Sequence, residues 1–482
     1  LLSSLPKKKK TLSLVAIVAT TIMESSIQNK VTILDVYRIT PASNLPEFSM
    51  PITFFDCGFL HLPTIATLFL YQLPESSPSH FNSVIVPNLK RSLSLTMTHF
   101  FPLAGRLTWP QHEQMPSILF TPNDSVKLTI AESTNPESFT SLAGNKPFKA
   151  SESRPYMPEL HTTDSEAEVI SLQVTLFANH GIAMGVGFHH AILDAKSVSV
   201  FLKAWAHMTK LNSGLLLPPE LTPFLDRSVV KDPEAFCLKV LNRLEELRPP
   251  SAPRSSLKLP TTSALDPTLV RATFEVSLDD ARKLKEMALC KLGSTETLHL
   301  STFVLVYSYS LTCLVKAKNI QLGNFKEVTC GVAAECRSYL DPPLNENYIG
   351  NCLVGCFVDV SEEVVRGENG FVDVAKIISE CIQGARNKSV YQAFNDNLPP
   401  PSPPCEGEVH FGVTGSPRLE FYQIDFGWGR PVKFEFTSID WTRGISMADR
   451  RDPDGGIEIG LVMTKGEMEV FDSLFVSGLK HL

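Results

Sequence analysis

The chain has 482 residues, of which 43% are hydrophobic and 20% charged, and its formal net charge at pH 7 is −7. This length exceeds what one hydrophobic core normally organises, and the composition is that of a folded chain rather than a disordered one, so we expect two domains. The net negative charge argues against nucleic acid as a partner, since a phosphate backbone would be repelled.

The N-terminal segment carries a basic run, Lys7 to Lys10, followed by the apolar residues 11–19, which superficially copies a signal peptide. The chain begins with Leu1, whereas Met23 looks like a natural start just ahead of the first strand-like segment. We therefore expect residues 1–22 to be a leader or a fragment-derived artefact.

The ten cysteines are spread through apolar segments, without a CxxC pair or the Cys/His spacing of a zinc site. Such a distribution is typical of buried, reduced thiols. No stretch approaches the ~20 apolar residues that a membrane span requires. These features predict a cytoplasmic protein without a membrane partner, which we expect to be a monomer.

The first half of the chain predicts a strand, a helix, a hairpin and a second helix. Residues 31–39 are rich in Thr and Val, as in a strand. Residues 88–101 carry apolar side chains at helical spacing. Residues 170–178 and 182–188 show alternating apolar positions on either side of a short turn, which is typical of a β-hairpin. After Asp194 the apolar period changes to 3.6, which predicts a helix.

Prolines from residue 215 to residue 264 would break any long element there, as expected of a crossover between domains. The predicted domains are therefore residues 23–214 and 265–482, joined by the linker 215–264. Both halves mix strands and helices, which favours two α/β domains with mixed sheets that face each other. The second half predicts strands at 270–276, 328–334 and 352–360, a helix at 279–290, a buried apolar element at 300–316, and a surface loop at 397–405.

The segment from Phe188 to Asp194, Phe-His-His-Ala-Ile-Leu-Asp, lies between a predicted strand and a predicted helix. Such junctions place side chains at the edge of a sheet, where clefts form. An imidazole with a pKa of about 6.5 is largely neutral at cytosolic pH and accepts a proton, which suits His190 as a general base. Gly185 and Gly187 leave one face of the strand without bulk, so we expect room there for a long, thin ligand.

Other interpretations of this segment stay open. A histidine beside an apolar strand is often a satisfied core residue. His189, His190 and Asp194 offer metal-ligand chemistry, but no distant cluster completes a site, so no metal is expected. Asp194 also suits a helix cap or an ion-pair partner. Serine-nucleophile chemistry is disfavoured because residues 412–416 lack the GxSxG spacing.

A second feature is the segment Asp-Phe-Gly-Trp-Gly at residues 425–429. Two glycines bracket a tryptophan, which predicts a tight loop that holds a fixed aromatic side chain. Taken alone, this segment indicates structure rather than chemistry.

Together, His-x-x-x-Asp at 190–194 and Asp-Phe-Gly-Trp-Gly at 425–429 resemble the paired signatures of the plant BAHD acyltransferase family. Residues 95–110 are similar to the first-domain helix and turn of that family. Residues 348–352, Tyr-Ile-Gly-Asn-Cys, resemble the YFGNC motif of its anthocyanin and flavonoid glycoside acyltransferases. Residues 413–418, Val-Thr-Gly-Ser-Pro-Arg, are similar to a segment of the members that use malonyl-CoA.

The resemblance implies two chloramphenicol-acetyltransferase-like domains with a channel between them, which acyl-CoA enters from one side and the acceptor from the other. His190 would lie midway and take the proton of the acceptor hydroxyl as the oxygen attacks the thioester. Neither a covalent acyl-enzyme nor a metal is required, and no cofactor is bound tightly, because acyl-CoA is a co-substrate. Asp194 is expected to point away from the channel and hold the loop by an ion pair.

The resemblance also implies binding roles in the second half. Thr414 matches a position near the developing oxyanion and would donate its hydroxyl, with Ser416 as a weaker neighbour. Arg418 would pair with the free carboxylate of a malonyl group, because burying that anion without a cation is costly. Lys285 and Ser294 fall in the region that resembles the CoA-binding side of the family. Lys285 is explained equally well as an exposed lysine of a helix without a binding role.

The resemblance implies that Asp425 shapes a loop that supports CoA binding, together with the motif residues Phe426, Gly427, Trp428 and Gly429. A role of Asp425 as a second proton acceptor is the alternative that the resemblance offers.

Two positions depart from the family pattern. Ala195 stands where Gly is usual, which bears on the backbone after the motif, and Ile349 replaces the Phe of YFGNC, which bears on substrate fit.

These features predict an O-acyltransferase that moves a malonyl group from malonyl-CoA to a hydroxyl of a phenolic, flavonoid or anthocyanin glucoside. A hydroxycinnamoyl-CoA-dependent enzyme of the same fold is the nearest alternative. A non-catalytic small-molecule-binding homologue is another, for which Ala195 is the sequence hint. A carrier-protein-dependent condensation domain is disfavoured, because the sequence has no carrier or adenylation module beside it.

Overall fold

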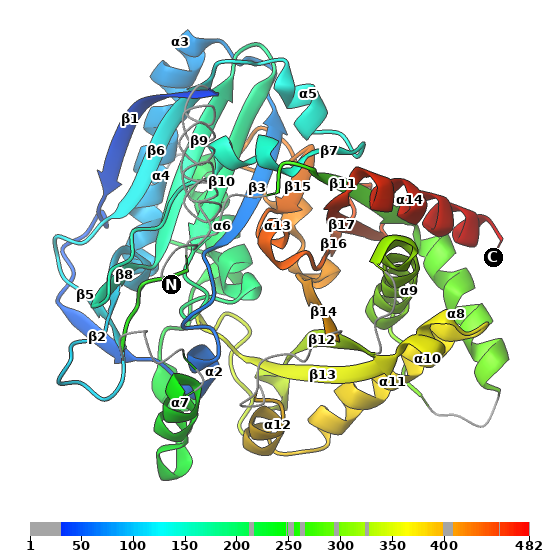
Figure 1. Cartoon of the computed structure of the whole chain (residues 1–482). Coiled ribbons are helices and arrows are strands. Elements are labelled where there is room, and N and C mark those ends of the chain that lie inside the picture. The colour runs from blue at the N-terminus through cyan, green and yellow to red at the C-terminus, as the bar shows by residue number, and fades with distance from the viewer. Residues whose placement is uncertain are drawn as a thin grey trace, which may run out of the picture.

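The structure is a computed structural model that describes residues 30–211, 216–246, 248, 255–260, 266–293, 298–322, 327–398, 408–452 and 454–481. Two lobes lie side by side, and each is built on a sheet that mixes parallel and antiparallel strands (Figure 1). The predicted α/β fold with mixed sheets is confirmed. The predicted leader 1–22 and the predicted CoA-binding residue Ser294 lie outside the described residues. Most of the predicted surface loop 397–405 also lies outside them.

The sheet of the first lobe contains the histidine motif at the end of one of its central strands. Its order is β1 (Val31–Ile39), β6 (Val126–Ser133), β9 (Ile170–Phe177), β10 (Gly181–Phe188), β3 (Ile65–Gln72) and β15 (Lys433–Phe436). β9 and β10 form the predicted hairpin, and Asn179 in its turn has a φ of 65°. Every residue of β9 and β10 is buried, so the alternating pattern does not mark a solvent-facing side.

Two helices, α4 (Val86–His99) and α6 (Ala195–Leu211), share one hydrophobic core with the first sheet. They also contact each other, since Thr209 Oγ1 donates to Ser92 Oγ at 2.8 Å and the rings of Phe100 and Phe201 meet edge to face. α6 starts directly after Asp194, so this packing fixes where the histidine segment ends.

At Gly185 and Gly187, the backbone of β10 is covered by another segment of the chain. A Cβ on Gly185 would lie 2.2 Å from the Tyr156 carbonyl oxygen, and one on Gly187 would lie 3.2 Å from that of Pro158. The two glycines therefore admit the chain's own backbone at residues 156–158. At these two glycines the prediction of room for a ligand was wrong, because a neighbouring segment fills the space that the missing side chains leave.

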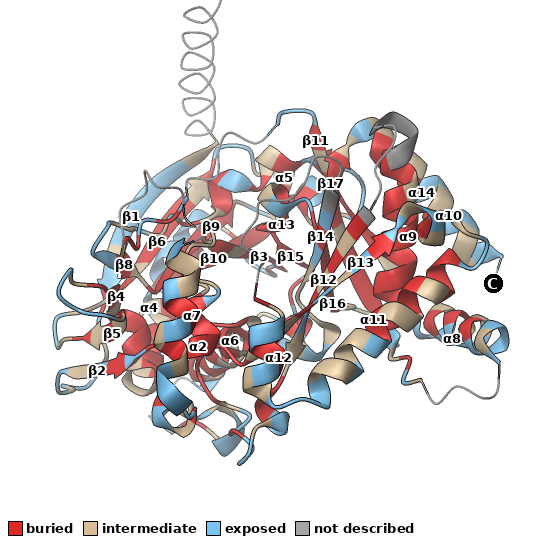
Figure 2. Cartoon of the chain, turned by 60° about the horizontal axis from the view of Figure 1, so that its bottom comes forward, coloured by how far each residue is buried: buried red, intermediate tan, exposed pale blue. Residues whose placement is uncertain are grey.

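The second lobe has a larger sheet covered by long helices. Its order is β13 (Leu353–Ser361), β12 (Glu327–Glu335), β14 (Glu408–Thr414), β16 (Ile445–Asp449), β17 (Ile457–Thr464), β11 (Leu269–Val276) and β7 (Phe148–Lys149). The helices of this lobe are α8 (Leu278–Leu292), α9 (Thr302–Leu322), α10 (Glu362–Arg366), α11 (Gly370–Arg386) and α14 (Lys465–Lys480). Figure 2 shows α9 largely buried between its neighbours, as its apolar sequence predicts.

The remaining elements frame the two lobes. A small third sheet has the order β2 (Phe48–Pro51), β5 (Ser117–Phe120), β4 (Arg106–Thr108) and β8 (Glu166–Glu168). The shorter helices are α2 (Phe54–Cys57), α3 (Pro78–His80), α5 (Ser138–Leu142), α7 (Phe236–Glu246), α12 (Val390–Asp396) and α13 (Ile439–Thr442). α7 lies inside the predicted linker 215–264, so the expectation that prolines would break any long element there was wrong; its apolar residues Cys237, Val240 and Leu241 are buried.

The two lobes exchange strands. β15 comes from the second half of the chain but pairs with β3 in the first sheet, and β7 comes from the first half but pairs with β11 in the second. Both exchanged strands are short, at four and two residues. A cut in the linker therefore does not separate the sheets.

A buried charge cluster joins the lobes where the exchanged strand passes. Arg271 on β11 is 1% exposed, and its Nη1 lies 3.0 Å from Glu435 Oε2 on β15. Its Nη2 pairs with Asp440 on α13 and donates to the carbonyl of Thr437 at 3.4 Å. Because an unpaired charge is costly in a dry interior, these residues depend on one another.

No helix in the described ranges combines the length and the apolar character that crossing a bilayer requires.

Candidate active site

His189 is a structural residue of the loop after β10. It is fully buried, its backbone N–H donates to the Val169 carbonyl at 2.9 Å, and its Nδ1 accepts from Ala191 N–H at 3.3 Å. Burial lowers the pKa of His189 to about 3. This imidazole therefore stays neutral, and the core-residue interpretation applies to it.

His190 is only half-buried, and its ring stacks flat on Phe59, with 4.0 Å between the ring centroids and 6° between the planes. Its Nδ1 is buried and makes no hydrogen bond to any described residue. Burial lowers the pKa of His190 below its usual 6.5, although the nearby carboxylate of Asp194 opposes that shift. The arrangement gives a neutral imidazole at cytosolic pH, with Nε2 as the nitrogen left for proton transfer.

Asp194 is 1% exposed, and both of its carboxylate oxygens are occupied within the protein. Oδ1 accepts from the backbone N–H and from the hydroxyl of Ser197, each at 2.8 Å, and so caps the start of α6. Oδ2 lies 2.8 Å from Arg337 Nη2. The ion pair expected of Asp194 is present, and these contacts leave its carboxylate to hold the loop rather than to carry protons.

Arg337 ties this loop to the Tyr-Ile-Gly-Asn-Cys segment. Its Nη2 also donates to the carbonyls of Tyr348 and Gly350, each at 3.0 Å. Asn351 completes the link, since its Nδ2 donates to the His190 carbonyl at 2.7 Å.

The departure from the family pattern at Ala195 is accommodated because this residue is the first of α6, and alanine is favourable in a helix.

Thr414 ends β14, beside Ser446 of β16. Gly415 follows with a φ of 83°, and a Cβ there would lie 2.6 Å from the Met447 carbonyl oxygen, so the turn after Thr414 requires glycine. Ser416 Oγ accepts from the N–H of Arg418, whose side chain is exposed. These contacts are local, so the approach of the three side chains to the His190 imidazole stays a prediction.

The Asp425 carboxylate organises its own loop. Oδ1 accepts from the N–H groups of Gly427 and Gly429 at 2.8 and 2.9 Å, and Oδ2 lies 2.9 Å from Lys210 Nζ on α6. Both glycines have positive φ, of 100° and 91°. Phe426 packs edge to face on Trp205 of α6 and stacks on Trp428. These contacts support a structural role for Asp425, and none of them places it beside His190.

The predicted CoA-binding pair is only half described, because Ser294 lies outside the described residues. Lys285 is exposed on α8. Within the described part of the chain, no group of three or more His, Cys, Asp or Glu side chains is placed to hold a metal ion.

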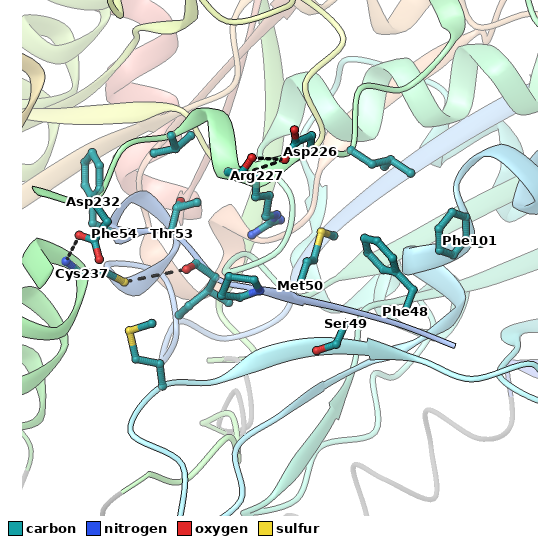
Figure 3. A pocket seen from close by; sticks show the side chains of 16 residues that line it. Phe48, Ser49, Met50, Thr53, Phe54, Phe101, Asp226, Arg227, Asp232 and Cys237 are labelled. Carbon is teal, nitrogen blue, oxygen red and sulfur yellow. Dashed lines mark hydrogen bonds between the residues drawn. The ribbon is translucent and has the colours of Figure 1, made fainter. Parts of the chain in front are cut away.

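Among the described residues, the cavities large enough for a small molecule include the following two. One, of about 470 Å³, lies between β2, α2 and the segment 225–237; Figure 3 shows the rings of Phe48, Phe54 and Phe101 around it. The other, of about 880 Å³, lies across β1, β6 and β3 and reaches Trp441 of α13. His190 lines neither cavity, so the predicted channel past this residue stays a prediction.

Sequence reasoning missed three residues that contact the histidine loop, Phe59, Arg227 and Arg337, and a fourth, Asp56, that contacts two of its partners, Arg227 and Asn351. One signal was available for Asp56, which is the single charged residue in the apolar run 52–60. A lone charge in such a run predicts a buried ionic partner. The partner itself lies far away in the sequence and could not be named.

Comparisons with known proteins place the chain in a family. The model of the Transferase family matches residues 29–476. Phenolic glucoside malonyltransferase 1 of Arabidopsis thaliana is 38% identical, over 95% of this chain and 99% of the relative. Two further Arabidopsis thaliana relatives are each 36% identical: malonyl-CoA:anthocyanidin 5-O-glucoside-6''-O-malonyltransferase, over 94% of this chain and 100% of the relative, and agmatine coumaroyltransferase, over 92% and 98%.

The fold agrees with this assignment. The crystal structure of vinorine synthase superposes with a TM-score of 0.65 at 21% sequence identity, over 93% of this chain and 98% of the other. The predicted family and the predicted two-domain fold are confirmed. The chain belongs to the Transferase family and is one of its BAHD acyltransferases.

Proposed function

We propose that this protein transfers a malonyl group from malonyl-CoA to a hydroxyl of a phenolic or flavonoid glucoside, with His190 as the general base. The observation that carries the proposal is the state of this imidazole: neutral, half-buried, and held by a loop whose Asp194 is fixed by Arg337. The donor and acceptor classes are supported by the names of relatives that match nearly the whole chain.

In the proposed reaction, His190 Nε2 accepts the proton of the acceptor hydroxyl as its oxygen forms a bond to the thioester carbonyl carbon. The carbonyl oxygen becomes an oxyanion, toward which Thr414 would donate its hydroxyl. The tetrahedral intermediate then collapses, the carbon–sulfur bond breaks, and the CoA thiolate recovers the proton from His190. The chain's own residues supply the base and the oxyanion donor, and no acyl-enzyme forms.

The remaining roles follow the same proposal. Arg418 would pair with the malonyl carboxylate, with Ser416 holding the backbone beside it. Lys285 and Ser294 would contact the CoA phosphates, and Asp425 would shape the loop that supports CoA binding. The monomeric state and the cytoplasmic location remain predictions.

A second candidate donor is a hydroxycinnamoyl-CoA. It is favoured by the agmatine coumaroyltransferase, whose name combines a coumaroyl donor with an amine acceptor at a similar level of identity. The proposal is therefore tested with malonyl-CoA and coumaroyl-CoA crossed against a flavonoid glucoside, a simple phenolic glucoside and agmatine, with product masses measured. Malonylated glucoside as the main product supports the proposal; coumaroylagmatine as the main product would replace it, and absence of any product would leave a binding protein.

Replacing Arg418 by alanine should raise KM for malonyl-CoA about tenfold, because a charge-assisted hydrogen bond to a carboxylate contributes about 1.5–3 kcal/mol. KM for coumaroyl-CoA, which has no free carboxylate, should change less than about twofold. Initial rates over a range of both donors measure this. Arg366→Ala, at an exposed arginine of α10, is the matched control, and an equal loss with both donors in Arg418→Ala would refute the pairing with malonyl.

A further inference from the structure

A fully buried carboxylate lies next to the histidine loop and belongs to none of the family motifs quoted above. Asp56, on α2, is 0% exposed. Its Oδ2 accepts from the N–H and the hydroxyl of Thr53 at 2.7 and 2.9 Å and lies 2.5 Å from Arg227 Nη1. Arg227 is itself almost completely buried. Such a pair is weak evidence for stability, because the cost of removing both charges from water offsets their attraction.

Asp56 reaches the histidine loop through two donors. Its Oδ1 accepts from Asn351 Nδ2 at 2.9 Å, and the same Nδ2 donates to the His190 carbonyl at 2.7 Å. On the other side, Arg227 Nη2 donates to the Ile192 carbonyl at 2.9 Å. One carboxylate thus orients two side chains, each of which holds a backbone carbonyl of the loop.

The chemistry of the carboxylate explains why this orientation is unique. An ionised Asp56 only accepts hydrogen bonds, so it selects the amide nitrogen of Asn351 rather than the amide oxygen. Without that selection the terminal amide, whose torsion is broad, could turn its oxygen toward the His190 carbonyl and repel it. The charge of Asp56 also keeps the Arg227 guanidinium oriented so that it donates to the Ile192 carbonyl.

We propose that Asp56 is a positioning residue for the general base, which sets the backbone of His190 through Asn351 and that of Ile192 through Arg227. This inference rests on the proposed role of His190. It assigns Asp56 no contact with either substrate.

The charges around His190 determine how removal of the Asp56 charge changes the pKa of the His190 imidazole. Asp194 faces it from the same loop and is paired with Arg337, while Asp56 faces it from α2 and is paired with Arg227. The neighbouring His189 is neutral. Burial lowers the pKa of His190, and both carboxylates oppose that shift. Loss of the Asp56 charge would leave the Arg227 cation unbalanced, so the pKa of His190 would fall further.

Asp56→Asn should therefore lower kcat by about tenfold or more, since a small misplacement of a catalytic group costs up to about 10²-fold. KM for the acyl donor should stay within about threefold of wild type, because Asp56 does not bind it. The acid limb of kcat/KM, which reports the free enzyme's base, should move to lower pH. A general loosening of the fold would not move that limb in a defined direction.

Asn351→Ala tests the same path while leaving the Asp56–Arg227 pair in place, and it decides the matter if Asp56→Asn does not fold. It should also lower kcat by about tenfold, and the double variant should lose less than the product of the two single losses, because the path through Asn351 is common to both. Thermal melting of each variant establishes the folded fraction. Glu435→Gln is the control, since Glu435 is another buried carboxylate paired with a buried arginine; it should lower the melting temperature and leave kcat and the pH limb unchanged.

The positioning role is overturned if folded Asp56→Asn and folded Asn351→Ala keep wild-type kcat and pH limb, or if their losses simply multiply. His190→Ala separates this outcome from failure of the proposed function. If His190→Ala abolishes turnover while the Asp56 and Asn351 variants behave as wild type, the base stands and the positioning fails. If His190→Ala remains active, the base itself is refuted.

Discussion

His190→Ala is expected to lower kcat by about 10²–10⁴-fold, the usual contribution of a positioned general base. The substitution removes the proton acceptor but leaves the loop, because the Asp194–Arg337 pair and the Asn351 contact to the backbone carbonyl do not involve the imidazole. Binding of CoA, measured by calorimetry, should be retained. Steady-state rates at saturating donor measure the loss, and turnover within about tenfold of wild type would contradict the role.

The wild-type pH profile carries the same prediction. Because burial lowers the pKa of His190, the imidazole stays neutral to a lower pH than a free histidine. The acid limb of kcat/KM should therefore lie below pH 6.5, and activity should be lost as the pH falls through that limb, when the base becomes protonated. His112→Ala serves as the control, since His112 is an exposed histidine with 82% of its side chain accessible. It should leave both the rate and the limb unchanged.

The second large effect concerns stability. Arg271→Met should lower the free energy of unfolding by about 3–5 kcal/mol, the typical cost of removing one partner of a buried ionic group. The carboxylates of Glu435 and Asp440 would remain buried without their cation, at the place where the exchanged strand joins the two lobes. Equilibrium denaturation in urea measures this change.

An exposed arginine provides the comparison for this effect. Arg282 on α8 forms ion pairs with Asp279 and Glu286, and 59% of its side chain is accessible. Solvent and salt screen such pairs, so Arg282→Ala should leave the denaturation midpoint close to that of wild type. A midpoint for Arg271→Met equal to that of Arg282→Ala would show that the buried cluster does not hold the lobes together.

Local patterns in the sequence predicted the elements that carry their own periodicity. The strand at 31–39 was found with the bounds of β1, the hairpin strands before the histidine motif were found within about two residues, and the helix after the motif was found with its start. The apolar residues of α6 recur at the helical period, and those of β9 and β10 alternate on either side of a turn, so both patterns are visible in the sequence, while β1 was found by its Thr and Val content.

The exchanged strands could not be predicted in this way. β7 has two residues and β15 has four, which is too short for a period to emerge. Gly185 misled for a related reason, since an absent side chain marks a close approach but does not tell whether a ligand or the chain's own backbone makes it.

The residues of the candidate site also differ in whether they lie close together in the sequence or meet only in the fold. His190 and Asp194 were found because they share one short segment. The carboxylate of Asp56 and the amide of Asn351 meet only in the folded chain, because their hydrogen bond joins a residue of the first half of the sequence to one of the second half. Contacts of this kind depend on tertiary packing, which a single sequence does not display.

The strand exchange also sets an order of events during synthesis. β3 leaves the ribosome early, but the edge that β15 covers stays unpaired until residues 433–436 emerge near the end of translation. β7 likewise waits for β11 to be made. For most of its time on the ribosome the nascent chain thus presents an apolar, open strand edge of the sort that seeds aggregation, and truncated copies of the first lobe should need a chaperone to stay in solution.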